Sequence, residues 1–165
     1  KGTDTTKRTV GAKYATEFYA VGRVGTYTYS ENFVVFRDNG AHVACAITGP
    51  QETTWGGKRH YICQNHAPYI SQTTDGDDIT ADEAHYITAI LNAPIVKRFV
   101  ESSSDNRSFE VRILETLRVD RFDSTNKNHK RLVRLSKKAH ADPSIENLAK
   151  IDPQLNAAYL KSLHS

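Results

Sequence analysis

The sequence predicts an α+β domain, in which a twisted, mainly antiparallel or mixed β-sheet from the first half is packed against helices from the second half. Runs of β-branched and aromatic residues such as Phe33-Val34-Val35-Phe36 are typical of strands, and the Asn39-Gly40 pair is a strong hairpin signal. After residue 80, apolar residues recur at helical spacing. The chain has 165 residues, of which 38% are hydrophobic and 25% are charged. We therefore expect a single domain over residues 1–165 with a buried core.

The strands expected in the first half are short and are separated by polar turns. Residues 55–59 (Trp-Gly-Gly-Lys-Arg) are expected to form a polar, flexible loop, because two adjacent glycines interrupt regular structure. Residues 1–13 are expected to be a flexible lead-in. The expected strands are residues 18–21, 33–36, 42–47, 61–63 and 68–71.

The second half contains clear helix boundaries. Thr80 and Glu83 form a capping box that predicts a helix start. Pro94 predicts that this helix ends at Asn92-Ala93 and that a second, short helix begins at the proline. A loop is expected over residues 102–106.

The last third combines one expected strand with two expected helices. Residues 117–122 alternate like a strand, and Asn126 is expected to cap a helix that runs through Ala139. Asp152-Pro153 is expected to begin the last helix, within a C-terminal helical extension over residues 142–165. The side chains expected in the core of the helical half are Tyr86, Leu91, Phe99, Leu132, Val133, Leu135, Leu155, Tyr159 and Leu160.

Charge is unevenly distributed, although the net charge is only +3. Residues 66–96 contain no Lys or Arg and five acidic side chains, whereas residues 97–140 contain 12 basic and six acidic ones. Clustered Lys and Arg attract polyanions and bind phosphates. A solvated helical surface is the alternative explanation of the basic zone.

The two cysteines, Cys45 and Cys63, lie in apolar stretches, and their spacing matches no zinc or redox motif. We expect buried, reduced thiols, which favour a cytoplasmic protein. No metal site is expected, because the histidines beside Cys63 lack a second ligand pair and the aspartates of residues 75–78 lack the spacing of a calcium loop. No apolar run approaches the roughly 18 residues of a membrane span, so no membrane partner is expected.

No catalytic motif stands out in the sequence. We find no glycine-rich nucleotide loop and no nucleophile elbow. An amino-methyltransferase base pocket needs a polar residue, two prolines and an aromatic in a row. Residues 92–95 (Asn-Ala-Pro-Ile) lack the second proline and the aromatic, so they predict a helix break. Neither catalytic residues nor a cofactor site is expected in these 165 residues.

Three segments carry a family resemblance. Residues 22–29 (GRVGTYTY), followed by 33–37 (FVVFR), resemble a glycine–x–tyrosine–threonine–aromatic segment that leads into a strand. Residues 82–94 (DEAHYITAILNAP) resemble a helix that ends in leucine–asparagine–small–proline. Residues 113–123 (ILETLRVDRFD) and 129–140 (HKRLVRLSKKAH) resemble a strand leading to a basic helix.

In this order the segments resemble the C-terminal target-recognition region of adenine-specific DNA methyltransferases of restriction–modification systems, type II or type IIG-like. The resemblance implies a domain that recognises double-stranded DNA by sequence and positions the target adenine. The methyltransferase catalytic domain of the same, longer chain would bind S-adenosylmethionine and transfer the methyl group, and in some members an endonuclease shares that chain. The chain begins with Lys1 and contains no Met, so we expect it to be a piece of a longer protein.

Candidate DNA contacts are side chains that can reach bases or phosphates. Arginine reads guanine edges and Asn or Gln reads adenine, whereas most contacts go to phosphate. The candidates are Arg23, Tyr27, Tyr29, Gln51, Trp55, Lys58, Arg59, His60, Asn106, Arg107, Lys127 and Lys130.

Each group of candidates has a structural alternative. Trp55 could lie in the core beneath an ordinary loop, and Tyr27 and Tyr29 could be core tyrosines beside a turn. The same turn could instead let the backbone at Gly22 and Gly25 approach a phosphate. The basic residues after Asn126 could simply be solvated.

Two other classes of function remain open. A protein-interaction or regulatory module could dock on another subunit through the acidic residues 75–83 and the terminal helices. A small stand-alone enzyme would need a convergent acid/base pair, which the sequence does not show.

Overall fold

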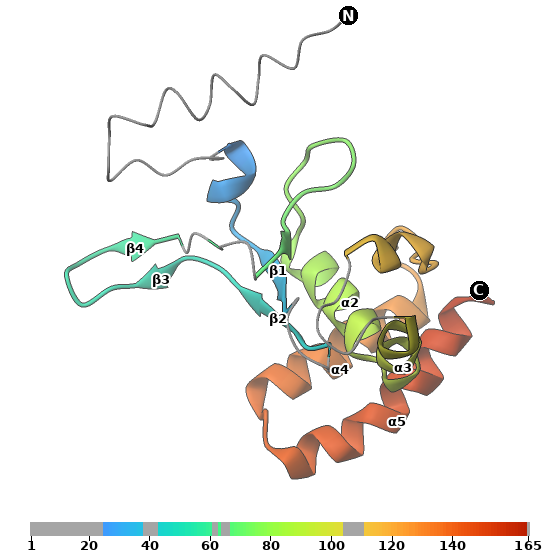
Figure 1. Ribbon diagram of the computed structural model, residues 1–165. Coiled ribbons are helices and arrows are strands. Elements are labelled where there is room, and N and C mark those ends of the chain that lie inside the picture. The colour runs from blue at the N-terminus through green and yellow to red at the C-terminus, as the bar shows by residue number, and fades with distance from the viewer. Residues whose placement is uncertain (1–24, 38–42, 61–62, 64–66, 104–110, 165) are drawn as a thin grey trace, which may run out of the picture.

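The computed structural model describes residues 25–37, 43–60, 63, 67–103 and 111–164 (Figure 1). Within these residues a small antiparallel sheet forms from the first half of the chain and four α-helices form from the second half. The predicted α+β class is therefore confirmed.

The larger sheet has three antiparallel strands in the order β2–β1–β5. The central strand β1 (Phe33–Phe36) pairs with β2 (Cys45–Thr48) on one side and with β5 (Tyr69–Ile70) on the other. Val34 illustrates the register, because it lies opposite Ile47 on β2 and Ile70 on β5. Strand β1 has its predicted bounds, and three of its four side chains are buried.

The other expected strands differ from the prediction. Strand β2 is shifted toward the C-terminus of the expected 42–47, and β5 covers only the middle of 68–71. Cys63 lies outside the described strands. The expected strand 18–21 and the turn at residues 38–40 fall outside the described residues, and so does the rest of 61–63.

Helix α2 (Ala81–Asn92) covers the sheet and links it to the other helices (Figure 1). It contacts β1 and β2, packs against α4 (Lys127–Ala141), and α4 in turn packs against α5 (Ile145–Ser162). Tyr86, Ile90 and Leu132 are fully buried in this layer. Burial of large apolar side chains is the main source of folding free energy, so the core lies between the helices and β1.

Both ends of α2 follow the sequence prediction. The Thr80 hydroxyl accepts a hydrogen bond from the Glu83 amide at 3.2 Å, and the Glu83 carboxylate accepts one from the Thr80 amide at 2.8 Å. Ala93 is extended, and α3 (Pro94–Ser103) begins at the proline. The Asn156 side chain on α5 accepts the Ile95 amide of α3 at 2.9 Å. The break between α2 and α3 is therefore confirmed.

The predicted strand over residues 117–122 is wrong. This segment follows the 3₁₀ helix η2 (Val111–Thr116) and has irregular backbone. Side chains of the helices hold it in place: the Tyr86 hydroxyl donates to the Asp120 carbonyl at 3.1 Å, and the Tyr159 hydroxyl donates to the Arg118 carbonyl at 3.2 Å. Among the described strands none pairs with the segment, so alternation alone was insufficient to make it a strand.

The last helix begins earlier than predicted. Ser144 caps α5 by accepting the Asn147 amide at 3.3 Å, and the helix continues through Pro153, eight residues after its start at Ile145. Proline at this position loses a backbone donor without ending the helix, so Asp152-Pro153 was misread as a start.

Three smaller predictions about the helices are also wrong. Ser102 and Ser103 belong to α3 and not to a loop. Phe99 and Leu160 are partly exposed, because they lie beside the buried faces of their helices. The other expected core side chains are buried.

In the part of the chain that the structure describes, no helix has both the length and the apolar character needed to cross a membrane.

Candidate nucleic-acid interface

The central candidate is a two-stranded hairpin that projects away from the helices (Figure 1). Strand β3 (Gln51–Glu52) pairs with β4 (Lys58–Arg59) in antiparallel register. Gln51 lies opposite Arg59, and Glu52 lies opposite Lys58. All four residues are exposed. Residues directly opposite on antiparallel strands share a face, so the register places an amide and a guanidinium side by side on one face of the ribbon.

A hydrogen-bonded turn closes this hairpin, where the sequence predicted only a flexible loop. The Thr53 amide donates to the Gly57 carbonyl at 3.2 Å, and the Gly56 amide donates to the Thr53 carbonyl at 3.1 Å. The Thr53 hydroxyl also lies 3.2 Å from each of the Gly56 and Gly57 carbonyl oxygens. Gly56 and Gly57 have φ values of +95° and +74°, a region that strongly favours glycine. The two glycines are therefore required by the turn itself.

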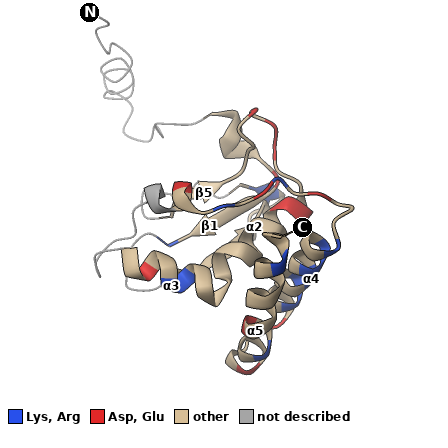
Figure 2. Ribbon diagram, turned by 90° about the vertical axis from the view of Figure 1, so that its right-hand side faces the viewer, with Lys and Arg blue, Asp and Glu red and all other residues tan. Residues whose placement is uncertain are grey.

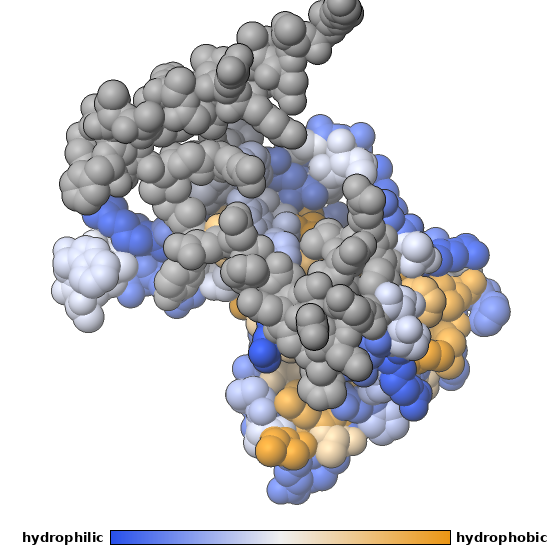
Figure 3. Space-filling model, in the orientation of Figure 1, coloured by the Kyte–Doolittle hydropathy of each residue, from blue (hydrophilic) through white to orange (hydrophobic). Residues whose placement is uncertain are grey.

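Trp55 lies in this turn with 79% of its surface exposed. The alternative that it fills the core is wrong. In Figure 3 the hairpin reaches outward as a hydrophilic stem with a paler free end, well separated from the hydrophobic surface over the helices.

The hairpin is fastened at its root by side chains from two helices. Strand β2 precedes β3, and its outer edge has no strand neighbour among the described residues. Asn92 of α2 accepts the Cys45 amide at 3.2 Å and donates to the Cys45 carbonyl at 2.7 Å. His140 of α4 accepts the Ile47 amide on its Nε2 at 3.1 Å, while its Nδ1 lies 2.9 Å from the Ser136 carbonyl. The Nε2 atom is therefore the acceptor in this contact, and the Nδ1 atom is placed to donate to the Ser136 carbonyl.

Asn92 and His140 are the structural residues that sequence reasoning missed. Asn92 was predicted only as part of a helix break, and His140 as part of a basic stretch. Capping an open sheet edge protects its backbone groups from other partners. The hairpin therefore starts from a strand whose position is fixed by both helices.

The two candidate tyrosines lie on η1 (Thr26–Tyr29), before the sheet. Tyr29 is 63% exposed, and its ring meets the His60 ring edge-on at a centroid distance of 5.8 Å. The exposed Tyr29 and the half-buried His60 therefore form an aromatic pair next to β4. The alternative that both tyrosines belong to the core is wrong, because Tyr27 is also exposed.

The space beside Gly25 is occupied from within the protein. A Cβ at Gly25 would collide with the ring of Tyr27, so this glycine accommodates a side chain. Approach of a phosphate to the backbone at Gly25 stays a prediction.

A second candidate surface is the cationic face of α4. The helix contains six Lys and Arg residues and no acidic residue, and Figure 2 shows Lys and Arg recurring along it. Lys127 and Lys130 are exposed. The buried face of the helix is formed by His129, Leu132, Val133, Leu135 and Ser136.

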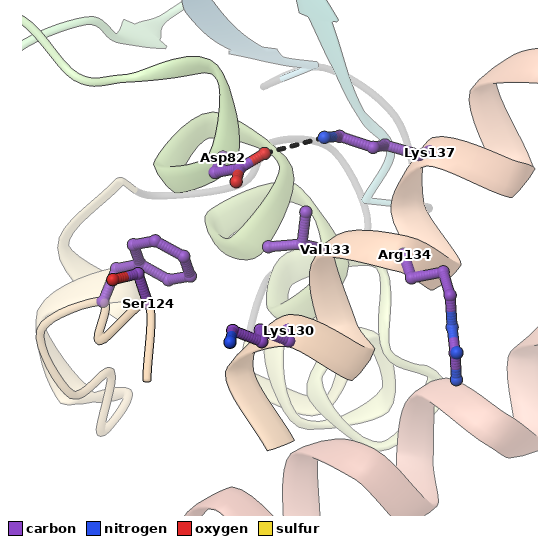
Figure 4. Close-up of a pocket in the computed structure, with 7 residues that line it drawn as sticks. Asp82, Ser124, Lys130, Val133, Arg134 and Lys137 are labelled. Carbon is purple, nitrogen blue, oxygen red and sulfur yellow. Dashed lines mark hydrogen bonds and ion pairs between the residues drawn. The ribbon is translucent and has the colours of Figure 1, made fainter. Parts of the chain in front are cut away.

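A groove of about 310 Å³ lies between the first turn of α2 and α4 (Figure 4). Lys137 and Asp82 form an ion pair of 2.7 Å across it. Lys130 points toward the side of Ser124, whereas Arg134 points away from Asp82. Within the described part of the chain neither Lys130 nor Arg134 has a carboxylate partner, so both cations are available to an anion. The groove lining comprises Asp82, Phe122, Ser124, Lys130, Val133, Arg134 and Lys137.

The acidic segment 75–83 is largely engaged inside the domain. Asp78 accepts the Ser30 hydroxyl at 2.7 Å and the Gln72 amide at 3.1 Å, and these bonds hold the pKa of Asp78 below its usual value. Asp82 pairs with Lys137, and Glu83 caps α2. Residues 75–78 belong to a polar turn, with Gly76 at φ +89°.

The structure brings together only part of the predicted set. Gln51, Trp55, Lys58, Arg59 and His60 share the hairpin and its base, with Tyr29 beside His60. Lys127 and Lys130 lie on α4. Arg23, Asn106 and Arg107 fall outside the described residues.

Both thiols are free and partly buried. Burial raises the pKa of Cys45 to about 12 and also raises the pKa of Cys63, so neither is activated as a thiolate. Among the described residues no group of three or more His, Cys, Asp or Glu side chains is placed to hold a metal ion.

Comparisons of the chain with family models, with curated proteins and with solved structures found no match.

Proposed function

We propose that this chain is the sequence-specific, double-stranded DNA recognition domain of an adenine-specific DNA methyltransferase, or methylase–nuclease, of a restriction–modification system. The projecting β3–β4 hairpin is the observation that carries the proposal, because it presents Gln51, Arg59 and Trp55 outside the domain. The family resemblance of the three segments supports the same conclusion.

The two-stranded form and the side chains of the hairpin suit the reading of a DNA groove. The major groove of B-DNA admits a two-stranded β-ribbon. A glutamine can bind an adenine edge and an arginine a guanine edge, each through two hydrogen bonds. Gln51 and Arg59 share one face of the ribbon and can read neighbouring bases. Lys58 on the other face is suited to a phosphate.

The cations of α4 supply the sequence-independent part of binding. Lys and Arg side chains on a surface attract DNA over the whole duplex, whereas base contacts select the sequence. Lys127, Lys130 and Arg134 are exposed and suited to phosphates.

The chemical step belongs to a separate catalytic domain of the same longer chain. That domain would bind S-adenosylmethionine and take up the target adenine, which must leave the base stack to be methylated. The recognition domain positions the DNA for this step, in the cytoplasm.

Duplex binding over a salt series tests the proposal. We expect fluorescence anisotropy of labelled duplexes to report binding at low salt, with log K falling linearly as log salt concentration rises. A chain that fails to bind duplex DNA even at low salt, or binds it without any dependence on salt, contradicts the proposal.

A protein-interaction module is the second candidate, favoured by exposed apolar side chains on α5. Ile145 is 88% exposed, and Leu160 is also exposed. The acidic segment gives this candidate little support, because three of its five carboxylates are engaged within the domain. It predicts a stable complex from nuclease-treated lysate that survives without DNA, and recovery of no partner counts against it.

A further inference from the structure

We propose that Trp55 inserts its indole ring into the base stack of bound DNA, as an aromatic wedge at the free end of the hairpin. This inference rests on the DNA-recognition function proposed above and assigns a separate role to the tip. Gln51 and Arg59 would read base edges, whereas Trp55 would contact base faces.

The exposure of Trp55 is the first argument. Tryptophan is highly buried on average, because its ring carries a large apolar surface. Here it is the only tryptophan of the chain, and 79% of its surface is in water in the turn of a projecting hairpin. A large aromatic side chain held in water on a projecting element is typical of a binding anchor.

The turn defines the position of the backbone that carries the ring. Four contacts within residues 53–57 close the turn, two of them from the Thr53 hydroxyl. Among the described residues, no atom lies within 4 Å of the Cβ positions that Gly56 and Gly57 lack, so these two positions of the turn are open. An anchor that is ordered before binding loses less entropy when it binds.

The distribution of charge along the hairpin matches a duplex. Residues 53–57 (Thr-Thr-Trp-Gly-Gly) carry no charge, and the cations Lys58 and Arg59 follow directly behind them. In DNA the base faces lie inside and the phosphates lie along the groove edges. The stem carries the cations Lys58 and Arg59 and one carboxylate, Glu52, so its net charge is positive. An uncharged tip with a net positive stem can therefore contact both at once. Proteins that bind the minor groove frequently insert apolar side chains between base steps and unstack them, and the wedge proposed for Trp55 makes the same kind of contact from the tip of the hairpin.

The single tryptophan makes the inference directly measurable. Duplexes enriched from a randomised pool by rounds of binding are titrated into the full chain, while Trp55 emission and the anisotropy of the labelled duplex are recorded together. We expect bound DNA to quench the emission and to protect the indole from iodide. A 2-aminopurine placed in the enriched duplex is expected to brighten as its neighbours unstack.

Matched variants separate stacking from simple apolar contact. Trp55→Phe keeps an aromatic face, whereas Trp55→Leu keeps an apolar side chain without one. We expect Trp55→Leu to weaken binding about tenfold or more and Trp55→Phe to weaken it less, since base–aromatic stacking depends on the flat ring. Ile145→Ala, an exposed apolar residue on α5, serves as the control and is expected to bind like the wild type. Circular dichroism verifies that each variant is folded.

The experiment distinguishes failure of the Trp55 wedge from failure of the proposed DNA-recognition function. If the chain binds DNA but Trp55→Leu binds equally well and the emission of Trp55 is unchanged, the wedge is overturned while the recognition function stands. Trp55 would then be free for a protein partner, such as the catalytic domain. If anisotropy detects no duplex binding by the wild type, the proposed function fails together with the wedge.

Discussion

The helical layer and the β3–β4 hairpin differ in what holds them together. In the layer, side chains such as Tyr86 and Leu132 are fully buried between α2, α4 and α5. The hairpin has exposed strands, and hydrogen bonds within its own turn define its tip. The two regions meet at β2, where Asn92 and His140 fix the strand that leads into the hairpin. The helical layer therefore provides most of the folding stability, whereas the exposed side chains of the hairpin are accessible to a binding partner.

The same difference explains what the sequence could predict. Apolar spacing and capping residues are local signals, and they correctly predicted α2, the break at Pro94 and most of α4. The strand predicted over residues 117–122 failed because its backbone is held by distant hydroxyl groups of Tyr86 and Tyr159. Asn92 and His140 were missed for the same reason, since their partners on β2 are 47 and 93 residues away in sequence.

For the hairpin, the sequence predicted the residues but missed the conformation. Two glycines after a tryptophan indicated a loop, whereas the pairing of residues 51–52 with 58–59 was too short to be recognised as strands. The candidate contacts Gln51, Trp55, Lys58 and Arg59 nevertheless fall together on it.

The largest expected effect is in the core of the layer. Leu132→Ala removes a fully buried side chain and is expected to lower the free energy of unfolding by about 2 to 5 kcal/mol. Trp55→Ala, at the exposed tip, is expected to change it by no more than about 0.5 kcal/mol. Urea denaturation of both variants measures the difference. Equal losses would mean that the tip is part of the core.

The next effect concerns the junction of the two regions. Asn92→Ala leaves the amide and the carbonyl of Cys45 without their side-chain partner, and we expect a loss of about 2 kcal/mol. The matched control is Asn156→Ala, which removes a single bond to the Ile95 amide and is expected to cost about 1 kcal/mol. Denaturant unfolding compares the two, and a smaller loss for Asn92→Ala than for Asn156→Ala contradicts the role of Asn92.

A smaller effect is expected from acidification. Burial is the main cause that lowers the pKa of His85 from 6.5 to about 4. The neighbouring His140 and Lys137 lower this pKa further, whereas the Asp82 carboxylate raises it. The unfolded chain therefore binds more protons at this site, so stability is expected to fall as the pH drops from about 6.5 to about 4. Because the imidazole is partly solvated, the contribution is about 1 kcal/mol. Thermal unfolding across this pH range measures the loss of stability. The His85→Gln variant should show a smaller slope of stability against pH, and an unchanged slope excludes His85 as the cause.

The smallest effect is confined to the tip. Gly57→Ala places a side chain at φ +74° and is expected to destabilise the turn by about 1 kcal/mol while leaving global unfolding almost unchanged. Hydrogen exchange at the Thr53 amide, which donates to Gly57, should become faster. The amides of α2 should exchange as in the wild type, and a parallel change there would show that the hairpin does not open independently.

The central claim is that the hairpin contacts the DNA directly, together with the cations of α4, whereas α5 does not. The most direct test compares the salt dependence of duplex binding for two variants with the same change in net charge: Lys58→Gln with Arg59→Gln on the hairpin, and Lys150→Gln with Lys161→Gln on α5. We predict that the hairpin variant binds less tightly and that its slope of log K against log salt is shallower by about 0.9, since the phosphate contact of Lys58 is lost and each such contact contributes about 0.9. The lost base contact of Arg59 adds to the loss of affinity. The α5 variant is predicted to keep the wild-type slope. Equal slopes for the two variants, or a larger change for the α5 variant, would contradict the account.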